Sequence, residues 1–170
     1  ALGDATMTER SLYKRQMNRV TKELIIFISQ GAYAGRFPVV PGTAGTVAGV
    51  LLYLAMKGLS PAWYLFWCAV IIAGGTWAAG RAEVLLERKD PPSVVIDEVA
   101  GFLLSMFMVP PQWGFVVAGF FLFRIFDIIK PYPLNRLQDL HGGAGVMLDD
   151  IGAGIYTNIV LQLAAYLKLL

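Results

Sequence analysis

The sequence contains few charged residues. Asp, Glu, Lys and Arg make up 15% of its 170 residues, whereas about 25% is usual in a water-soluble domain. A chain with so little charge lacks the polar surface that a dissolved globule needs, so the composition argues against an ordinary soluble enzyme. The length is that of one domain.

Cysteine and histidine are almost absent. With a single cysteine, Cys68, the chain has neither an intramolecular disulfide framework nor a Cys-rich zinc site. Cys68 lies inside an apolar run, where a thiol stays protonated, and we interpret it as a core residue. A single histidine, His141, excludes phosphatases that use one histidine as nucleophile and another as acid. The net charge of +2 is too small for a strongly basic surface, so no nucleic-acid partner is expected.

Long stretches without any charge are present instead. Four of them cover residues 37–56, 58–80, 99–123 and 151–167. A membrane core is spanned by about 20 helical residues. Several of these stretches are therefore long enough to cross a membrane, or nearly so.

Prolines and glycines divide these stretches into helices. Pro41 and Gly42 interrupt the first, and Pro110 with Pro111 splits the third into two antiparallel helices. The helices that we expect run over residues 46–57, 62–88, 94–109, 113–130 and 150–170, with a glycine-rich loop over 142–145. Together with a helix near the N-terminus, they predict an all-α, membrane-embedded bundle of about five to six helices.

Residues 8–30 form a segment of a different kind. Five basic residues precede the apolar residues 24–28, a pattern typical of an amphipathic helix that lies on an anionic lipid surface. A solvated helix packed on the protein fits the pattern equally well. We divide the chain into an N-terminal tail with an interfacial basic helix, residues 1–30, and a single helical domain, residues 31–170.

The expected helices reverse direction at each turn, so their ends lie alternately on two sides. Twelve of the fourteen Lys and Arg residues then fall on one side, and only Lys57 and Lys168 fall on the other. Because cytoplasmic segments of membrane proteins are enriched in Lys and Arg, the side with the twelve is predicted to face the cytoplasm. The conspicuous polar clusters of the chain all fall on this same side.

Four of these polar residues are carboxylates in two adjacent pairs, Asp97 with Glu98 and Asp149 with Asp150. A single acid at a helix start commonly caps the helix, but two pairs exceed that need. Clustered carboxylates at the edge of apolar helices repel one another unless a cation lies between them. Because every ligand offered is an oxygen, Mg²⁺ is the ion that this set suits.

Three further polar residues, Arg124, Asp127 and Lys130, follow one another at three-residue spacing. Each neighbouring pair shares a helix face, and a structural salt bridge alone would explain such spacing. Beside the acids, however, the two basic side chains could neutralise the oxygens of a phosphate.

A glycine- and threonine-rich loop that opens a helix offers a second set of anion-binding groups. Thr43, Gly45 and Thr46 supply backbone N–H groups and two hydroxyls at the positive end of the helix. Simple helix capping is the alternative. With the basic residues nearby, the loop favours a phosphate site, and the reaction that these groups could carry out is metal-assisted attack on a phosphate by water or by a carboxylate.

Four sequence motifs stand out and together span about two thirds of the chain. They read PGTAGT at 41–46, IDEVAG at 96–101, FRIFDIIKPYP at 123–133 and GGAGVMLDDIGAG at 142–154. In these motifs and their order the sequence resembles the phosphatidylglycerophosphatase A family. Members of that family are bacterial enzymes that remove the terminal phosphate of phosphatidylglycerophosphate to give phosphatidylglycerol.

The resemblance implies an all-helical, Mg²⁺-dependent phosphatase over residues 31–170 that acts on a membrane phospholipid. It also implies a place in the bacterial cytoplasmic (inner) membrane, with the active site facing the cytoplasm. No obligatory protein partner is inferred. Carried over by position, the site consists of the acids Asp97, Glu98, Asp149 and Asp150, completed by Arg124, Asp127 and Lys130.

Within that set, our hypothesis assigns Mg²⁺ to Asp97, Asp149 and Asp150, and the orientation of water to Glu98 or Asp127. The two basic side chains hold the phosphate, and the threonine loop completes its cradle. Neither the residues nor the resemblance decides which carboxylate binds metal and which handles the proton.

Two other membrane functions compete with this hypothesis. A small cation transporter would distribute its acids through the depth of the membrane, whereas these acids gather at one end beside Arg124 and Lys130, which would repel a cation. A CDP-alcohol phosphotransferase also uses Mg²⁺ in lipid synthesis, but its multi-Asp signature is missing from the sequence.

Overall fold

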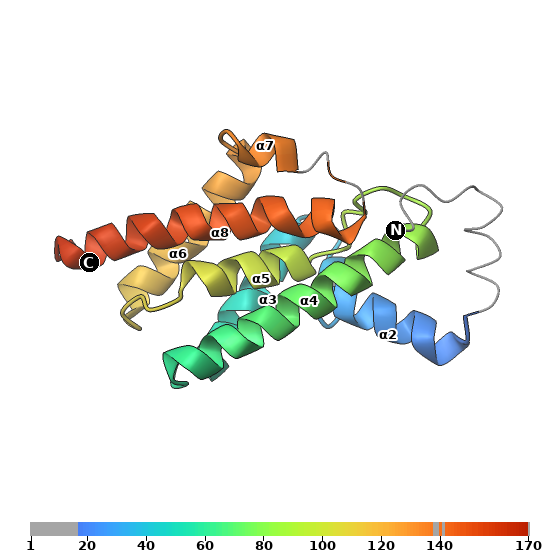
Figure 1. Cartoon of the computed structure of the whole chain (residues 1–170), viewed down its shortest axis with the longest axis horizontal. Coiled ribbons are helices and arrows are strands. Elements are labelled where there is room, and N and C mark those ends of the chain that lie inside the picture. The colour runs from blue at the N-terminus through green and yellow to red at the C-terminus, as the bar shows by residue number, and fades with distance from the viewer. Residues whose placement is uncertain (1–16, 138–139, 141, 170) are drawn as a thin grey trace.

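A computed structural model describes residues 17–137, 140 and 142–169. The basic residues before position 17 and His141 lie outside this part of the chain, so the expectations for them stay predictions. The described part consists of seven α-helices and one 3-10 helix and contains no strand (Figure 1). The all-α prediction is confirmed, and the count exceeds the expected five to six because of one four-residue helix, α7.

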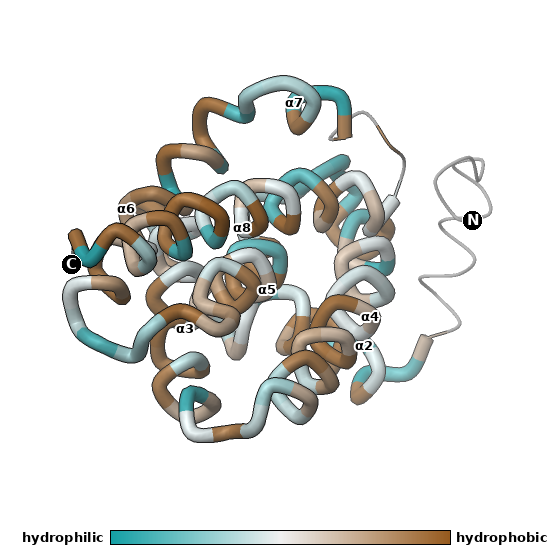
Figure 2. Tube along the Cα trace, turned by 60° about the vertical axis from the view of Figure 1, so that its left-hand side comes forward, coloured by the Kyte–Doolittle hydropathy of each residue, from teal (hydrophilic) through white to brown (hydrophobic). Residues whose placement is uncertain are grey.

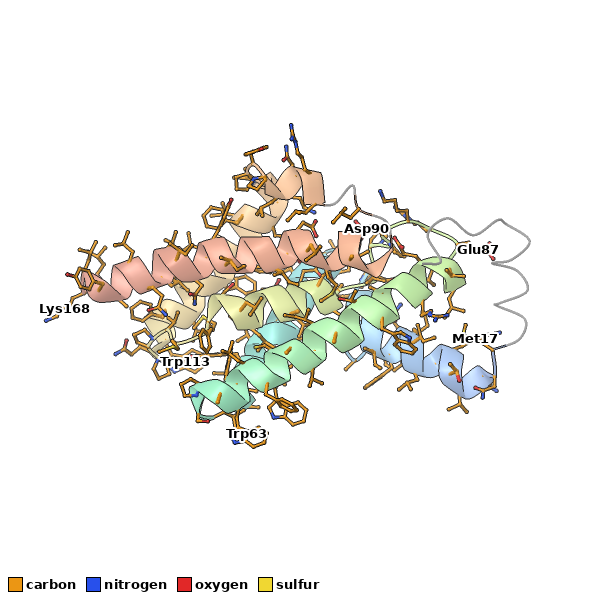
Figure 3. All side chains as sticks on the ribbon, viewed as in Figure 1. Met17, Trp63, Glu87, Asp90, Trp113 and Lys168 are labelled. Atoms are coloured by element: carbon orange, nitrogen blue, oxygen red, sulfur yellow. The ribbon has the colours of Figure 1, made fainter. Side chains whose placement is uncertain are left out.

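The elements are α2 (Arg19–Ser29), η1 (Ala34–Arg36), α3 (Pro41–Met56), α4 (Pro61–Leu85), α5 (Ile96–Ser105), α6 (Trp113–Ile129), α7 (Leu134–Leu137) and α8 (Gly143–Tyr166). The split at Pro110 and Pro111 is confirmed, since α5 and α6 flank it. Successive long helices run in opposite directions. Figure 3 accordingly shows Trp63, Trp113 and Lys168 at one end of the bundle and Glu87 and Asp90 at the other.

Helix α5 lies at the centre of the bundle. It packs against α3, α4, α6 and α8 (Figures 1 and 2). All of its residues except Glu98 and Leu104 are buried. A helix that is covered on every side forms the core of its domain, so whatever α5 carries at its ends is held firmly by its neighbours.

The C-terminal carbonyls of α5 are satisfied by side chains from its neighbours. Tyr64 Oη on α4 donates to Leu103 O at 2.7 Å. From α8, Asn158 Nδ2 donates to Ser105 O at 3.0 Å and to Phe107 O at 2.8 Å. The last carbonyls of a helix have no partner within it. Asn158, in the charge-free part of α8 over residues 151–167, and Tyr64 on α4 thus cap α5 and fix its position along the bundle.

Helices α5 and α8 approach each other at backbone contact. A Cβ added to Gly154 would lie 2.3 Å from the carbonyl oxygen of Gly101, and one added to Gly101 would lie 2.6 Å from the carbonyl oxygen of Asp150. Any larger side chain at these two positions would force the helices apart. This contact brings the N-terminal turn of α5 next to Asp150.

The predicted start of the helix at residue 46 is wrong, because α3 begins at Pro41. Proline suits the first position of a helix, where its missing N–H has no partner in any case and its fixed φ matches the helix. The stretch that we expected as a glycine–threonine loop is therefore the first turn and a half of α3.

The predicted start at residue 150 is also wrong, because α8 begins at Gly143. The glycines there pack against another helix: a Cβ at Gly143 would lie 1.8 Å from the carbonyl oxygen of Thr76 on α4. Only Gly142, with φ of 70°, has a backbone that requires glycine for a turn. Asp149 and Asp150 consequently lie two turns inside α8 and not at its start.

Helix α2 lies on the bundle against α4. Ile25 is fully buried, and the backbone N–H of Val95 donates to the carbonyl of Ser29 at 2.9 Å. This helix is therefore packed on the protein, as the second interpretation of residues 8–30 requires. Its outer face still exposes Val20 and Leu24, so a lipid contact along that face stays a prediction.

The outer surface of the bundle is rich in exposed apolar side chains, and Figure 2 shows that much of the trace of the helices is hydrophobic. On α4, α6 and α8 they include Trp63, Phe66, Trp67, Trp77, Val117, Phe121, Ile125, Ile155, Ile159 and Leu163. Among the described helices, α4 alone is both long and apolar enough to cross a membrane. Its length and composition fit association with a membrane.

Candidate active site

A hollow of about 500 Å³ opens at one end of the bundle. It lies where α3 and α5 begin, where α6 ends and where the second turn of α8 passes. Its lining residues are Pro41, Gly42, Arg88, Asp90, Pro92, Val94, Asp97, Glu98, Arg124, Asp127, Ile128, Lys130, Val146, Asp149 and Asp150. Segments that lie more than 100 residues apart in the sequence therefore contribute to one space.

Three carboxylates form a compact cluster in this hollow. Asp97, Glu98 and Asp150 each have an oxygen within 4.8 Å of the others. The side chains of Asp97 and Asp150 are nearly inaccessible, with 8% and 3% of the residue surface exposed. One oxygen of each of the three acids is buried and has no hydrogen-bond partner among the described residues. Because unpartnered buried carboxylates are costly, the cluster is suited to a cation.

Burial and mutual repulsion raise the affinity of this cluster for positive charge. Burial, followed by the charges of Glu98 and Asp150, raises the pKa of Asp97 well above its ordinary value. Burial, followed by the charges of Asp127 and Glu98, does the same to the pKa of Asp150. Acids with a raised pKa hold a proton more readily than free carboxylates do, and a divalent ion can take the place of such protons.

The two acids of a pair reach different further partners, because consecutive helical residues point about 100° apart. On α8, Asp150 belongs to the carboxylate cluster beside α5, whereas Asp149 accepts a hydrogen bond from Lys130 Nζ. On α5, Glu98 Oε1 lies 3.7 Å from Arg124 Nη1 on α6. The pairs thus connect the acidic cluster to the cations on the other side of the hollow.

Both cations beside the cluster are fixed by acids. Arg124 Nη1 lies 2.6 Å from Asp127 Oδ2, one turn further along α6. Lys130 ends α6 in the left-handed conformation, which turns the chain at this point. Burial lowers the pKa of Lys130, but the hydrogen bond and charge of Asp149 outweigh that effect, so the pKa lies above its ordinary value. Both side chains therefore carry positive charge beside the acids.

The first turn of α3 closes the hollow from another side. A Cβ added to Gly42 would lie 2.4 Å from Glu98 Oε1 and 3.0 Å from Arg124 Nη1. A larger residue at position 42 would require the ends of the Glu98 and Arg124 side chains to move away from the start of the helix. Since N–H groups in the first turn of a helix have no partner within it, this end of α3 presents a positive dipole and donors to the site.

Residues 27–165 match the sequence profile of the family described as phosphatidylglycerophosphatase A. The chain belongs to the phosphatidylglycerophosphatase A family. This result confirms the resemblance that the four motifs indicated.

Three relatives of known name cover most of the chain. A protein of Bacteroides thetaiotaomicron with the provisional name phosphatidylinositol-3-phosphatase is 35% identical over 84% of this chain and 94% of its own length. Phosphatidylglycerophosphatase A of Escherichia coli is 33% identical over 79% of each chain, and that of Haemophilus influenzae is 31% identical over 84% of this chain and 89% of its own. No solved structure matches the chain.

In this member of the phosphatidylglycerophosphatase A family, seven of the predicted site residues line the same hollow: Asp97, Glu98, Arg124, Asp127, Lys130, Asp149 and Asp150. Their convergence follows from the helix reversals and from the close contact of α5 with α8. The composition of the acidic cluster differs from the hypothesis in one respect. Glu98 joins Asp97 and Asp150 in it, while Asp149 is engaged by Lys130.

The three residues of the expected phosphate loop are placed differently. Thr43, Gly45 and Thr46 are not among the described residues that line the hollow. The hydroxyl of Thr46 is fully buried and donates to the carbonyl oxygen of Gly42 at 3.0 Å. Gly45 allows α3 to pack on Val95, since a Cβ there would lie 2.7 Å from Val95 Cβ. In the structure Gly45 and Thr46 therefore stabilise the packing and the first turns of α3 and do not face the hollow.

Among the charged residues that line the hollow, sequence reasoning missed Arg88 and Asp90, and it did not predict that Gly42 lies against Glu98. Gly42 lies inside the PGTAGT motif, so the motif could have drawn attention to it. Arg88 and Asp90 follow the end of α4 in a turn region, and no local pattern distinguishes them from ordinary surface charges.

Proposed function

We propose that the protein hydrolyses the phosphomonoester of phosphatidylglycerophosphate, giving phosphatidylglycerol and inorganic phosphate. One observation carries the proposal: buried, unpartnered oxygens of Asp97, Glu98 and Asp150 lie beside two fixed cations at one end of an apolar bundle. The names of the Escherichia coli and Haemophilus influenzae relatives supply the substrate. A hollow of about 500 Å³ is in the range of small-ligand sites, so it has room for a phosphorylated headgroup.

Mg²⁺ is the cofactor that we propose. Asp97, Glu98 and Asp150 would hold it, because their oxygens lie close together and one oxygen of each acid lacks another partner among the described residues. When bound, the ion polarises a phosphate oxygen and lowers the pKa of a water molecule. Asp149 would contribute indirectly by holding Lys130 in position.

Arg124 and Lys130 bind the oxygens of the phosphate in this proposal. Lys130 donates one N–H group to Asp149 and keeps further donors for the substrate, and Arg124 Nη1, although paired by charge with Asp127, has no hydrogen-bond partner among the described residues. The N-terminal turn of α3 at Gly42, which lies next to Arg124, adds its dipole. Together they meet the negative charge that spreads over the phosphate oxygens as the bond to the leaving group breaks.

Water is the attacking group, and Asp127 is the base that we assign to it. The carboxylate of Asp127 lines the hollow and interacts with both Arg124 and Asp150, which hold it in place. It takes a proton as the water oxygen bonds to phosphorus, and the bond from phosphorus to the glycerol oxygen breaks. The departing glycerol oxygen then receives the proton that Asp127 has taken, which yields phosphatidylglycerol and returns Asp127 to its carboxylate form.

The substrate determines where the site has to lie. Its acyl chains remain in the bilayer while the headgroup reaches a polar site at the membrane edge. We place that edge on the cytoplasmic side of the bacterial inner membrane, because the topology expected from the sequence puts twelve of the fourteen Lys and Arg residues on the side that holds the polar clusters. The apolar faces of α4, α6 and α8 would contact lipid, and the basic N-terminal segment would lie on the anionic surface.

The test is Asp150→Asn with phosphatidylglycerophosphate in mixed micelles and saturating Mg²⁺. We expect phosphate release to fall by about a thousandfold or more, because the change removes a charged oxygen ligand from the cluster. Glu23→Gln, a similar loss of charge at an exposed position on α2, is the matched control and should retain activity.

Two results would contradict the proposal. Release close to the wild-type rate in the Asp150 variant would exclude the acidic cluster as the reaction centre. Faster release by the wild type from phosphatidylinositol 3-phosphate than from phosphatidylglycerophosphate would instead exclude the substrate and favour the activity in the name of the Bacteroides relative.

A further inference from the structure

A second hollow adjoins the proposed catalytic one. Its volume is about 520 Å³, and it is lined by η1, the residues that precede α3 and the segment that follows α4. Pro41, Arg88 and Pro92 line both hollows. The second differs in charge, because Arg36 and Arg88 line it and none of the described residues that line it is acidic.

Arg36 is held in a fixed position in this second hollow. Its Nε donates to Gln30 Oε1 at 3.1 Å, and its guanidinium carbon lies 4.0 Å from the centre of the Tyr33 ring. The backbone of η1 also fits closely against the loop before α5, since a Cβ at Gly35 would lie 2.0 Å from the carbonyl oxygen of Ser93. A guanidinium that is already positioned loses little side-chain entropy when it binds an anion.

Arg88 lies at the junction of the two hollows. The ion pairs of the described residues engage Arg124 and Lys130 with acids, and none of them involves Arg88. Its charge is thus available to a ligand that extends from one hollow into the other. Guanidinium groups bind phosphate oxygens in a two-pronged manner, so the ligand chemistry that this position fits best is a phosphate.

We infer that Arg88 and Arg36 bind the phosphodiester of the lipid substrate while its phosphomonoester lies at the acidic cluster. The inference rests on the proposed function, because phosphatidylglycerophosphate carries both groups, separated by one glycerol. Phosphatidylinositol 3-phosphate, which appears in the name of the Bacteroides relative, likewise carries a diester beside its monoester. The second hollow would therefore bind the phosphodiester, which these two headgroups share.

The surroundings of the second hollow match the polarity of such a lipid. Phe37 lines it, and Val39 and Val40 follow before α3 begins. All three are exposed, Val39 by 79%. Exposed apolar residues thus lie beside Arg36 in the segment that borders the second hollow, where the acyl chains would continue from the diester. This arrangement orients the lipid with its chains toward the bilayer.

Competitive inhibition separates the two phosphate sites. Phosphatidylglycerol carries only the diester, and inorganic phosphate imitates only the monoester. In Arg88→Gln we expect the inhibition constant of phosphatidylglycerol to rise by about tenfold or more, because a charge-assisted hydrogen bond is lost. In the double variant that also carries Arg36→Gln, the two effects should add. The inhibition constant of phosphate should stay within about twofold, since the residues that we assign to the monoester remain. Lys89→Gln, an exposed neighbour that is not among the lining residues of either hollow, is the matched control.

Each outcome decides the inference. Equal weakening of both inhibitors in Arg88→Gln would show that Arg88 serves the monoester, and unchanged inhibition by phosphatidylglycerol would show that the diester binds elsewhere; either result overturns the inference and leaves the proposed function standing. A wild-type protein that releases no phosphate from phosphatidylglycerophosphate would overturn the proposed function itself, and the inference with it.

Discussion

The two ends of the bundle differ in whether their buried polar groups have hydrogen-bond partners. At the end where α5 stops, its carbonyls accept hydrogen bonds from Tyr64, Asn158 and Gln162. At the end where α5 starts, buried oxygens of Asp97 and Asp150 have no hydrogen-bond partner among the described residues. Buried polar groups are nearly always paired, so an open set marks a place where a ligand completes the pairing.

The hollows at the two ends differ in size as well. The one at the far end measures about 110 Å³ and is lined by Tyr53, Lys57 and Tyr64 among others, whereas the one at the acidic end measures about 500 Å³. The smaller space has room for a few water molecules, and the larger one for a headgroup. The far end therefore stabilises the fold, and the acidic end is where substrate chemistry is possible.

The largest effect that would test this contrast is expected from Asp97→Asn at the acidic end. We predict a loss of phosphate release of about a thousandfold, since a charged oxygen of the cluster disappears. The midpoint of thermal unfolding in detergent should not fall, because the change removes repulsion among buried acids and the new amide can donate to Glu98. A parallel loss of activity and stability would mean that Asp97 supports the fold and not the reaction.

A smaller effect of the opposite kind is expected from Asn158→Ala at the far end. The substitution leaves the carbonyls of Ser105 and Phe107 with fewer donors, so the free energy of unfolding should fall by about 1–3 kcal/mol. Phosphate release per folded molecule should stay within about twofold of the wild type. Gln162→Ala removes one bond, to Phe107, and should destabilise less. If Asn158→Ala abolished activity while unfolding was unchanged, the division of roles between the two ends would be wrong.

The sequence alone predicted correctly which polar residues lie at the acidic end, but it predicted the local structure around them less well. Prolines such as Pro110 and Pro111 determine where helices reverse, and reversal determines which polar residues share an end, so this part of the fold follows from local physics. The glycines before Asp149 were interpreted as a loop, and this prediction was wrong. Gly143 is needed for the close contact of α8 with α4, and a glycine required by packing cannot be distinguished from a loop glycine in the sequence alone. Arg88 had no motif to identify it. Its position depends on how η1 and α3 pack beside the end of α4.

The smallest effect that we expect is the stabilisation of the folded protein by Mg²⁺, and it is the most specific test of the difference between the two ends. A ligand that binds only the folded state stabilises it, by about 1.4 kcal/mol when its concentration is ten times its dissociation constant. We expect a stabilisation of this size in the wild type and in Gln162→Ala, whose acidic cluster is intact, and none in Asp150→Asn, which lacks one of the three charged ligands. Thermal unfolding with and without the ion measures this without any substrate. If the Asp150 variant were stabilised as much as the wild type, the ion would bind elsewhere, and the open oxygens at the acidic end would need another explanation.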